Sequence, residues 1–530
     1  MILVRNLKLS PEEDPGKLKE RAAEKLRVSP SQIVRWELRK RSLDARRKDR
    51  IHYVCTVGVT VDGSEEKLLR RSRSQDLAPD QETPYEIPPC RAQERPVVVG
   101  FGPAGMFSAL VLARAGLRPI VLERGQDALS RRRAIDLFRS GGPLDPENNV
   151  QFGEGGAGTF SDGKLNTGTH DRRISWVLEQ FHRHGAPESV LYDAKPHIGT
   201  DILIDVVQKL REDILSLGGE VRFGHRMSSL QIENGALTGL RVSGPDGEMT
   251  LPCRHVVLAI GHSARDTFEA LHRQGIPMER KAFAMGVRIE HPQRLIDRAQ
   301  YGRERGNLPP ADYSLHVHLP NGRSAFSFCM CPGGQVFAAA SEAGGVVTNG
   351  MSFSARDGEN ANAALLVGLK PEDFPGAGVL AGMYWQRELE QSAFRLGGGS
   401  YAAPAQLVGD FLSGRASNSP ASVLPSYRPG VLWTDLRLLL PDVISDTLRA
   451  ALPEFGRKLE GFDTADAVLT GPETRSSSPV RILRGADCSS ALAGLYPCGE
   501  GAGYAGGITS AAVDGMRCAE AVIAALNTGT

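Results

Sequence analysis

PVVVGFGPAGMFSALVLARAGLRPIVLERG, residues 96–125, is the stretch that decides the fold of this chain. It begins with a short run of valines, which predicts a buried strand. Gly100, Gly102 and Gly105 follow, and the Ala-rich apolar segment after them predicts a helix. A second apolar run ends on Glu123 and predicts the next strand. The order strand, Gly-rich turn, helix, strand, acid is typical of a unit that binds a dinucleotide.

The three glycines would serve different purposes in such a unit. Gly100 would permit the tight turn, Gly102 would let the backbone approach a pyrophosphate, and Gly105 would let the helix pack closely on the strand. Free N–H groups at the helix N-terminus would face the pyrophosphate, and Glu123 would accept hydrogen bonds from a ribose. The alternative is a Gly-rich turn that binds nothing, and finding all these features in one unit disfavours it.

Length and composition indicate a globular protein with several domains. The chain has 530 residues, more than one hydrophobic core usually supports, so two or three domains are expected. The formal net charge is +1, which gives no argument for a nucleic acid or a membrane as partner. No apolar run is long enough to span a membrane, and the N-terminus becomes charged too early for a secretory signal. Because eight cysteines are too few for a disulfide scaffold in so long a chain, we expect a cytoplasmic protein with reduced thiols.

Strand, helix and turn signals predict four parts along the chain. Residues 1–90 are expected to form a small N-terminal α/β (ferredoxin-like) module that ends in a polar linker. Residues 91–271 and 471–530 would form the two halves of a Rossmann-type α/β domain that holds the dinucleotide. Residues 272–470 have a different pattern of strands and hairpins, which predicts an interposed α+β substrate domain.

The N-terminal module contains a basic segment, Arg35–Arg50. It holds eight Lys or Arg residues against three Asp or Glu residues. Contact with a nucleic acid is one interpretation. A solvated hairpin is the interpretation we favour, because Trp36 is the one aromatic residue in the segment.

Two further Gly-rich segments are candidates for contact with a ligand. The loop GGPLDPENNVQFGEGGAGTFSDGKLNTGT, residues 141–169, contains Gly155 and Gly156 and places Lys164 as a cation beside whatever is bound. Near the end of the chain, LYPCGEGAGYAGGI, residues 495–508, predicts a strand, a Gly-rich turn and a helix N-terminus. An ordinary connecting loop and a helix that only docks on the sheet are the structural alternatives.

These motifs resemble those of FAD-binding oxidoreductases with a glutathione-reductase-type Rossmann domain. In such proteins a first fingerprint holds ADP, and a middle strand ending in Ala-x-Gly, here Ala259-Ile260-Gly261, passes near the cofactor. A C-terminal strand, acid and Gly-rich turn holds the ribityl chain and the flavin. The chain is most similar to the bacterial family of uncharacterised FAD-dependent dehydrogenases, through FGEGGAGTFSDGKL, SFCMCPGG, VVTNGMSFSARD, TRSSSPVRI and YPCGEGAGYAGGITSAAVDG.

The resemblance implies non-covalently bound FAD and a set of residues around it. Glu500 takes the position usually held by an aspartate on the ribityl hydroxyls, with a longer arm. The helix that begins at Ile508 would direct backbone N–H groups at the flavin, where negative charge collects on reduction. The implied cofactor-binding residues are Gly100, Gly102, Pro103, Ala104, Gly105, Glu123, Arg124, Gly155, Gly156, Lys164, Gly261, Gly499, Glu500, Gly506, Gly507 and Ile508. Candidate catalytic residues are Lys164, Arg475, Arg481 and Cys498.

The motifs predict an oxidoreductase that transfers hydride between FAD and an unidentified small substrate. The chain has one complete dinucleotide-binding fingerprint, and that motif is assigned to FAD. A nicotinamide donor, NAD(P)H, would therefore visit the flavin as a transient co-substrate without a domain of its own. The chain also lacks the C-x-x-x-x-C pair of flavoprotein disulfide reductases. The alternatives are a flavoprotein that acts on RNA and an FAD-binding sensor without turnover.

A hairpin around Asn321-Gly322 is the last candidate. A two-residue turn there would pair His318 with Ala325 and would place His316, His318, Cys329 and Cys331 on one face. A metal is disfavoured because Cys331 would lie roughly 13 Å along from the partner of His316, too far for one tetrahedral shell. We expect no metal, and instead expect Cys329, Cys331 and Cys498 to be thiols that approach the flavin.

Overall fold

The unit predicted at residues 96–125 is present in the computed structural model, which describes residues 1–72, 74–81 and 84–529. β5 (Val97–Val99) leads into α3 (Pro103–Arg114), and α3 leads into β6 (Ile120–Glu123), which pairs with β5 in parallel. Gly116 lies just beyond the end of α3 with φ +92°, a left-handed conformation that favours glycine at the end of a helix. The local signals of the sequence therefore determine this part of the fold.

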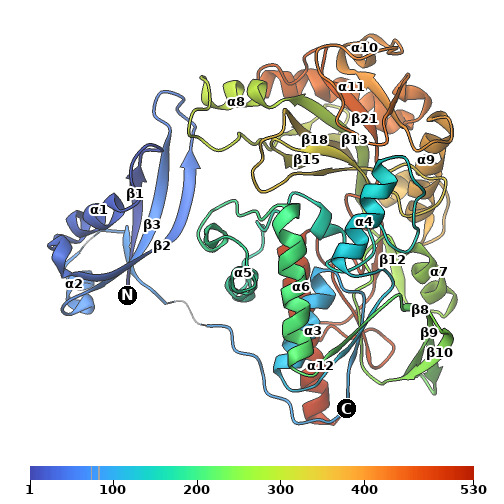
Figure 1. Ribbon diagram of the computed structural model, residues 1–530, viewed down its shortest axis with the longest axis horizontal. Helices are drawn as coiled ribbons and strands as arrows, with labels where there is room; N and C mark the ends of the chain where they lie inside the picture. Colours follow the sequence, from blue (N-terminus) through green and yellow to red (C-terminus); the bar gives the residue numbers. More distant parts are fainter. Residues whose placement is uncertain (73, 82–83, 530) are drawn as a thin grey trace.

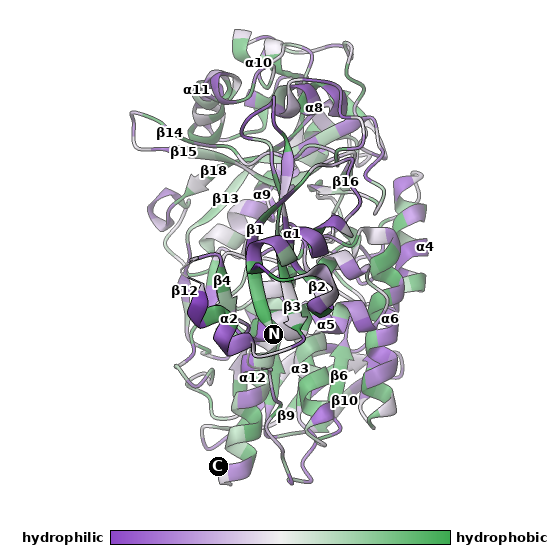
Figure 2. Cartoon of the chain, turned by 90° about the vertical axis from the view of Figure 1, so that its left-hand side faces the viewer, coloured by the Kyte–Doolittle hydropathy of each residue, from purple (hydrophilic) through white to green (hydrophobic). Residues whose placement is uncertain are grey.

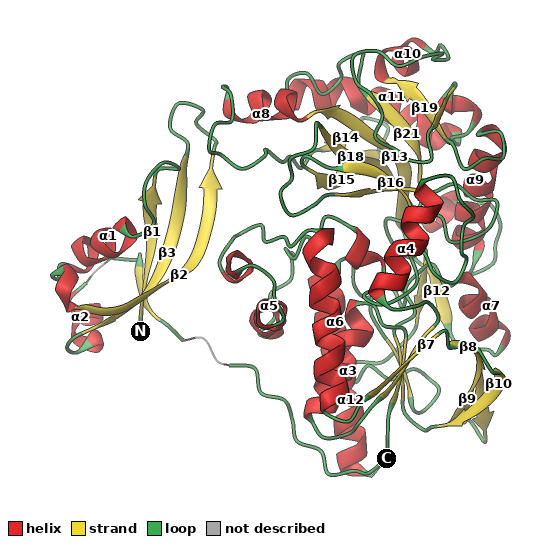
Figure 3. Cartoon of the chain, in the orientation of Figure 1, coloured by secondary structure: helices red, strands yellow, loops and turns green. Residues whose placement is uncertain are grey.

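The unit lies in the middle of a five-stranded parallel sheet with the order β23-β11-β5-β6-β7. The added strands are β7 (Glu220–Phe223), β11 (Val256–Leu258) and β23 (Leu495–Pro497). One face of the sheet is covered by α3, α6 (Thr200–Ser216) and α12 (Ile508–Thr528) (Figures 1 and 3). The other face packs on the antiparallel strands β8 (Arg226–Glu233), β9 (Ala236–Gly244) and β10 (Gly247–Pro252). Val98 packs toward the helices whereas Val97 and Val99 pack toward the strands, as the period of two requires.

The N-terminal module has the predicted ferredoxin-like topology. Its elements are β1 (Ile2–Leu9), α1 (Lys17–Leu26), β2 (Ile33–Asp44), β3 (His52–Val61), α2 (Glu65–Arg71) and β4 (Leu77–Pro79). The strands form an antiparallel sheet in the order β2-β3-β1-β4. Hydrophobic side chains of α1 and the sheet form a separate small core, and the module stands to one side of the remaining chain in Figure 1.

The basic segment Arg35–Arg50 follows β2 and the tip of the β2–β3 hairpin. β2 continues to Asp44, so most of the segment is strand. Arg41 forms an ion pair with Asp193 at 2.7 Å, and its backbone N–H donates to the Tyr192 carbonyl oxygen. Arg39 is paired with Asp80 at 2.8 Å. Two of the segment's arginines thus connect parts of this chain, as is expected of a structural hairpin.

The residues between the two halves of the α/β domain form a seven-stranded sheet with the order β14-β15-β18-β13-β21-β19-β20. Its strands are β13 (Phe283–Pro292), β14 (His316–His318), β15 (Ser324–Cys331), β18 (Asn360–Leu369), β19 (Ala403–Leu407), β20 (Val431–Trp433) and β21 (Val468–Glu473). The helices of this part are α8 (Gln293–Tyr301), α9 (Ala381–Leu396), α10 (Val408–Ser413) and α11 (Asp442–Lys458). A small ribbon, β16 (Gln335–Ala338) and β17 (Thr348–Met351), lies beside the sheet. This part has its own hydrophobic core.

The remaining elements connect or cover these parts. They are α4 (Ala128–Arg139), α5 (Arg173–Arg183), α7 (Arg265–Arg273) and the paired strands β12 (Met278–Arg280) and β22 (Val480–Ile482). None of the helices in the described residues combines the length and the apolar character that a membrane span requires.

The predicted register of the β14–β15 hairpin is wrong by one residue. His316 lies opposite Phe326 and His318 lies opposite Ser324. The Leu319 N–H donates to the Arg323 carbonyl oxygen, so the loop has three residues, with Gly322 at φ +79° in its last position. A bulge later in β15 adds a further shift. His316 and His318 are exposed, Cys329 is half-buried and Cys331 is buried, so the four predicted residues do not form one exposed cluster.

α3 and α12 pack side by side, and both are largely hydrophobic (Figure 2). A Cβ atom on Gly515 of α12 would overlap the Ala104 carbonyl oxygen of α3. A Cβ atom on Gly105 would likewise overlap the Gly100 carbonyl oxygen of the preceding turn. Both overlaps are with backbone atoms, which cannot move aside as a flexible side chain can. The two helices therefore approach each other and the turn at a distance that only glycine allows.

We expect Gly515→Ala to lower the melting temperature. Alanine in a helix interior normally stabilises by about 1 kcal/mol relative to glycine, but here the overlap with Ala104 outweighs that gain, for a net loss of roughly 1–3 kcal/mol. Gly368→Ala is the control, because a Cβ atom on Gly368 meets no heavy atom within 4 Å among the described residues. Calorimetry compares the two variants, and a Gly515→Ala protein that melts above the parent would contradict the close packing of α3 and α12.

Candidate functional site

A cavity of about 500 Å³ lies at the carboxyl ends of the parallel strands and continues toward the seven-stranded sheet. The three predicted motifs meet there although they are far apart in the sequence. The predicted cofactor-binding residues that line the cavity are Gly100, Gly102, Pro103, Ala104, Glu123, Arg124, Gly156, Lys164, Gly261, Glu500, Gly506, Gly507 and Ile508. In open α/β sheets the carboxyl ends of the strands are where ligands bind, so this cavity is the candidate site.

The glycines of the first motif have the geometry that their predicted roles need. Gly100 has φ +96° in the turn, and Gly105 makes the close contact of α3 with that turn. Gly102 lines the cavity and leaves room on that side, because the nearest atom to an added Cβ would be the Gly156 Cα at 3.6 Å. Within the described residues, no side chain caps the N-terminus of α3. The free N–H groups of α3 are therefore available to an anion at the Gly102 turn.

Glu123 and Arg124 fix the other side of this turn. The Glu123 carboxylate accepts hydrogen bonds from the backbone N–H groups of Phe101 at 2.8 Å and of Gly125 and Gly153 at 2.9 Å each. It thereby joins the end of β6 to both Gly-rich loops, and its predicted contact with a ribose stays a prediction. Arg124 forms ion pairs with Glu147 at 2.7 Å and Asp266 at 2.9 Å, so the carboxylates of the protein already pair its charge.

The C-terminal motif brings a second helix N-terminus to the same cavity. Gly506, Gly507 and Ile508 line it, and no side chain of the described residues caps α12. Three other predicted residues serve packing instead of lining the cavity: Gly105, Gly155 and Gly499. A Cβ on Gly499 would lie 2.8 Å from the Ala104 Cβ. Two uncapped helix N-termini at one cavity give positive potential at two points along a bound ligand.

Glu500 reaches a residue that sequence reasoning missed. His262 Nδ1 lies 3.0 Å from a Glu500 carboxylate oxygen, and both side chains line the cavity. His262 Nε2 is buried and has no hydrogen-bond partner among the described residues. Because His262 directly follows Gly261 of the middle motif, its position next to a predicted site residue was the signal available in the sequence.

Lys164 lies in a buried charge cluster around Asp162. The Asp162 carboxylate accepts hydrogen bonds from Arg356 and Ser352, and the Lys164 Nζ lies 3.9 Å away. Burial by itself would raise the pKa of Asp162, but Arg356 and Lys164 outweigh it and the pKa is lowered. Arg356 lies closer to Asp162 than Lys164 does. Of these two cations at the cavity wall, Lys164 is therefore the one whose charge Asp162 neutralises less.

Of the two candidate arginines, the structure brings Arg475 to the cavity wall. Arg475 is buried and pairs with Glu390 at 2.8 Å, a carboxylate that it shares with Arg265. Arg481 lies elsewhere, paired with Glu279 at 3.0 Å. The sequence could not distinguish the two arginines because only a short turn separates Arg475 from Arg481 in β22.

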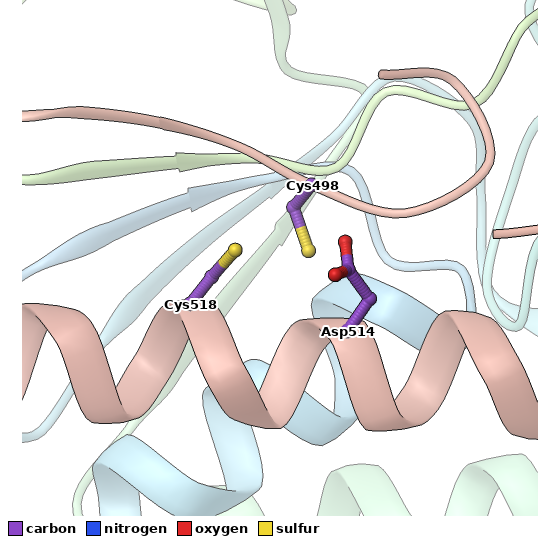
Figure 4. Close-up of side chains that lie close together, drawn as sticks. All are labelled: Cys498, Asp514 and Cys518. Atoms are coloured by element: carbon purple, nitrogen blue, oxygen red, sulfur yellow. The ribbon is translucent and has the colours of Figure 1, made fainter. Parts of the chain in front are cut away.

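The fourth catalytic candidate, Cys498, lines the cavity and lies beside Asp514 and Cys518 of α12 (Figure 4). Burial raises the pKa of Cys498. Asp514 accepts hydrogen bonds from Arg484 at 2.6 Å and from the Gly499 N–H at 2.7 Å. Arg484 also lies 3.3 Å from the Cys518 sulfur. A guanidinium group thus supplies the positive charge of this cluster, which fastens α12 to the end of β23.

Glu473, at the end of β21, is a second residue that the sequence did not single out. Its side chain lines the cavity and is 5% exposed, and burial raises its pKa to about 7. Arg288 Nη1 lies 3.6 Å from Glu473 Oε1 in an ion pair. Three further polar atoms here have no hydrogen-bond partner among the described residues: Glu473 Oε2, Tyr313 Oη and Arg288 Nε. Such buried groups cost about 1–3 kcal/mol each when unpaired, so this end of the cavity is suited to a polar guest.

FAD fits the cavity on these observations. The Gly102 turn and the uncapped end of α3 suit the pyrophosphate, and Glu123 lines the cavity beside that turn. The N-terminus of α12 suits the flavin, whose reduced form carries negative charge. Glu473 and Tyr313 line the same cavity but belong to none of the three motifs.

Comparisons with known proteins agree with this assignment. Residues 95–283 match the family model described as FAD binding domain, and residues 282–476 match FAD-dependent protein, C-terminal domain-like. Residues 1–60 match a domain of unknown function. The chain is 47% identical over 529 residues to an uncharacterized protein of Clostridium beijerinckii, with 98% of each chain covered. It is 28% identical to aklavinone 12-hydroxylase RdmE of Streptomyces purpurascens over 31% of this chain and 32% of that protein.

Solved structures show more distant likenesses. The flavin-dependent brominase Bmp2 is 12% identical, with 82% of this chain and 80% of that chain covered and a TM-score of 0.38. The p-nitrophenol 4-monooxygenase PnpA from Pseudomonas putida DLL-E4 is 14% identical, with 82% and 81% covered and a TM-score of 0.32. Likenesses at this level do not assign an activity.

We expect Gly102→Ala to fold normally and to lose FAD. The added Cβ makes only an ordinary contact of 3.6 Å with Gly156, but it occupies the side from which the pyrophosphate approaches. The purified variant should therefore be colourless, with at least a tenfold weaker FAD affinity by fluorescence titration and an unchanged circular dichroism spectrum. Gly378→Ala serves as the control, because a Cβ on Gly378 meets nothing within 4 Å in the described part of the chain. A Gly102→Ala protein that purifies fully yellow would contradict the assignment of the first motif.

Proposed function

The chain belongs to the same family as the Clostridium beijerinckii protein and is an FAD-dependent oxidoreductase, and we propose that it transfers hydride between FAD and a small anionic substrate. We propose further that the FAD-binding domain is of the glutathione-reductase type. The enzyme would act as a dehydrogenase, with NAD(P)H as the donor. We also propose a cytoplasmic location, supported by the eight cysteines, which are all free thiols in the structure.

One observation carries the proposal: the cavity continues past the three FAD motifs to a wall made by the interposed sheet. Phe328 and Cys329 of β15 and Glu473 of β21 line that wall, and Lys164 reaches it from the Gly-rich loop. A ligand that filled only the FAD motifs would leave this end open. We therefore assign it to the substrate.

The charges at this end favour an anionic substrate. Lys164, Arg356 and Arg475 line it, and Asp162 is the carboxylate that pairs closely with Arg356. Lys164 is 28% exposed and its Nζ lies 3.9 Å from Asp162, so its ammonium group can still form an ion pair with a bound anion. A carboxylate or phosphate on the substrate would complete this set.

Glu473 is suited to move the proton that accompanies a hydride. When FAD is bound, it supplies a carrier that takes up or gives up a hydride. Removing hydride from a carbon that bears a hydroxyl or amino group also requires that group to lose a proton, and the reverse reaction requires one to be added. A carboxyl group with a pKa of about 7 is readily protonated and deprotonated near neutral pH.

Anaerobic reduction of the purified holoprotein tests the proposal. NADH, NADPH and a panel of small hydroxy and amino acids would be added in turn, and the flavin absorbance followed in a stopped-flow spectrometer. We expect at least one nicotinamide and one small acid to change the redox state of the flavin. If none of them changes it while dithionite still bleaches the protein, the chain is a sensor without turnover and the proposal fails.

We expect Lys164→Met to lower the flavin reduction potential. Loss of a cation beside the ring makes the anionic reduced form less stable, by an amount on the order of 30 mV, or about 1.4 kcal/mol for two electrons. Spectroelectrochemical titration measures the shift. Lys370→Met, which removes an exposed lysine before a short surface helix, should leave the potential unchanged. Equal potentials in all three proteins would mean that Lys164 does not lie beside the flavin.

Glu473 leads to an expectation about stability and pH. Its pKa in the folded protein, about 7, is above the ordinary value of 4.5, so folding favours the protonated form. The stability from this protonation is fully present below pH 4.5 and is lost as the pH rises through 7. Relative to Glu473→Gln, the parent should lose roughly 1–3 kcal/mol between pH 5 and 8.

Melting temperatures of the two proteins across that pH range provide the measurement. Glu460→Gln removes an exposed carboxyl and should follow the parent at every pH. A constant difference between the parent and Glu473→Gln would contradict the raised pKa.

A further inference from the structure

Cys329 and Cys331 lie on a β-bulge at the wall of the cavity. In the pairing of β15 with β18, Phe328 lies opposite Ala364 and Cys331 opposite Asn362, so β15 has one extra residue at this point. Cys329 has φ +43°, a conformation that residues other than glycine seldom adopt. Bulges of this kind re-aim a side chain.

The bulge brings the Cys331 thiol onto the backbone of Cys329. In a regular strand, side chains two residues apart lie about 6–7 Å from each other along the strand. Here the Cys331 thiol donates a hydrogen bond to the Cys329 carbonyl oxygen at 3.2 Å. The Cys331 sulfur is therefore held next to the residue with which it would form a bond.

The two cysteines differ in access. Cys329 is half-buried and lines the cavity, whereas Cys331 is fully buried behind it. This is the arrangement in which an accessible thiolate attacks and a buried thiol resolves the product.

The surroundings favour the thiolate of Cys329. The neighbouring Cys331 thiol lowers the pKa of Cys329, and Lys164 and Arg288 lower it further, against the opposing effects of burial and Asp162. The same interaction raises the pKa of Cys331. Arg288 Nη2 lies 3.8 Å from the Cys331 sulfur and 3.0 Å from the Cys329 carbonyl oxygen.

We propose that Cys329 and Cys331 are a redox-active dithiol that reduces small disulfides entering the cavity. The Cys329 thiolate attacks one sulfur of the disulfide, and a mixed disulfide forms as the first thiolate leaves. Cys331 then gives up its proton, and its sulfur attacks the Cys329 sulfur and expels the second thiolate. Two electrons pass from the pair to the disulfide, which becomes two thiols after taking up the Cys331 proton and one from solvent, while the chain gains a Cys329–Cys331 disulfide.

This exchange uses only side chains of the chain and needs no hydride transfer. It can therefore be tested in the oxidised holoprotein without any reductant for the flavin. Failure of the exchange would leave the proposed hydride transfer intact, and failure of hydride transfer would leave the exchange intact.

The test uses bis(2-hydroxyethyl) disulfide and 2-mercaptoethanol as an anaerobic redox buffer. The holoprotein is equilibrated at a series of ratios, quenched with acid, denatured, alkylated and analysed by peptide mass spectrometry. We expect the peptide that contains both cysteines to lose its two alkylation sites together at a defined ratio, with Cys498 and Cys518 still alkylated. Cys90→Ser is the matched control, because Cys90 is a free cysteine outside the residues that line the cavity, and it should leave that transition in place.

Two variants distinguish the roles of the cysteines. Cys331→Ser should trap the mercaptoethanol mixed disulfide on Cys329, because no resolving thiol remains. Cys329→Ser should acquire no adduct on Cys331, which the cavity does not reach. Flavin absorbance shows that each variant is folded. The proposal is overturned if folded Cys331→Ser acquires no adduct, if the adduct appears on another cysteine, or if both thiols of the parent stay alkylated at the most oxidising ratio.

Discussion

The structure depends on the close approach of backbones at a few glycines around the first βα turn. Gly105 lets α3 lie against the turn at Gly100, and Gly515 lets α12 lie against α3. Gly501 similarly approaches Gly261, where an added Cβ would lie 2.5 Å from the Gly261 carbonyl carbon. These contacts join segments from the first, middle and last parts of the α/β domain. Because each is a contact with backbone atoms, any side chain would separate the two N-terminal helix ends that face the cavity.

A buried set of three charged side chains also holds the parts of the chain together. Glu390 of α9 is shared by Arg265 and Arg475, at 2.8 Å each, and all three side chains are buried. Burial by itself would raise the pKa of Glu390, but the two arginines outweigh it and hold the pKa far below its ordinary range. The triad connects α7 of the α/β domain to the interposed part, so the wall of the cavity is fixed in place. Removing one partner of such a set typically costs about 3–5 kcal/mol, because an uncompensated charge stays buried.

The sequence predicted those features that depend on neighbours along the chain. The FAD unit and the ferredoxin-like module follow from apolar periodicity and turn residues, and the structure has both of them. The β14–β15 register was missed because Asn321-Gly322 suits a two-residue turn, whereas Leu319 and Arg323 close a loop of three. Glu473 and His262 were missed for another reason. Burial by distant segments gives Glu473 its raised pKa and leaves one nitrogen of His262 without a hydrogen-bond partner among the described residues. For Glu473 no local pattern carries that information, and for His262 the one local signal was its place directly after Gly261.

The central claim is that one cavity holds FAD along the three motifs and a substrate against the interposed sheet. A crystal structure of the yellow holoprotein tests this most directly, through the position of the isoalloxazine ring. The ring should lie at the N-terminus of α12, near Gly507 and Ile508, with Lys164 beside it and Cys329 and Glu473 facing the open side. A ring that lies outside this cavity, or that fills the end lined by Glu473 and leaves no room for a substrate, would contradict the account.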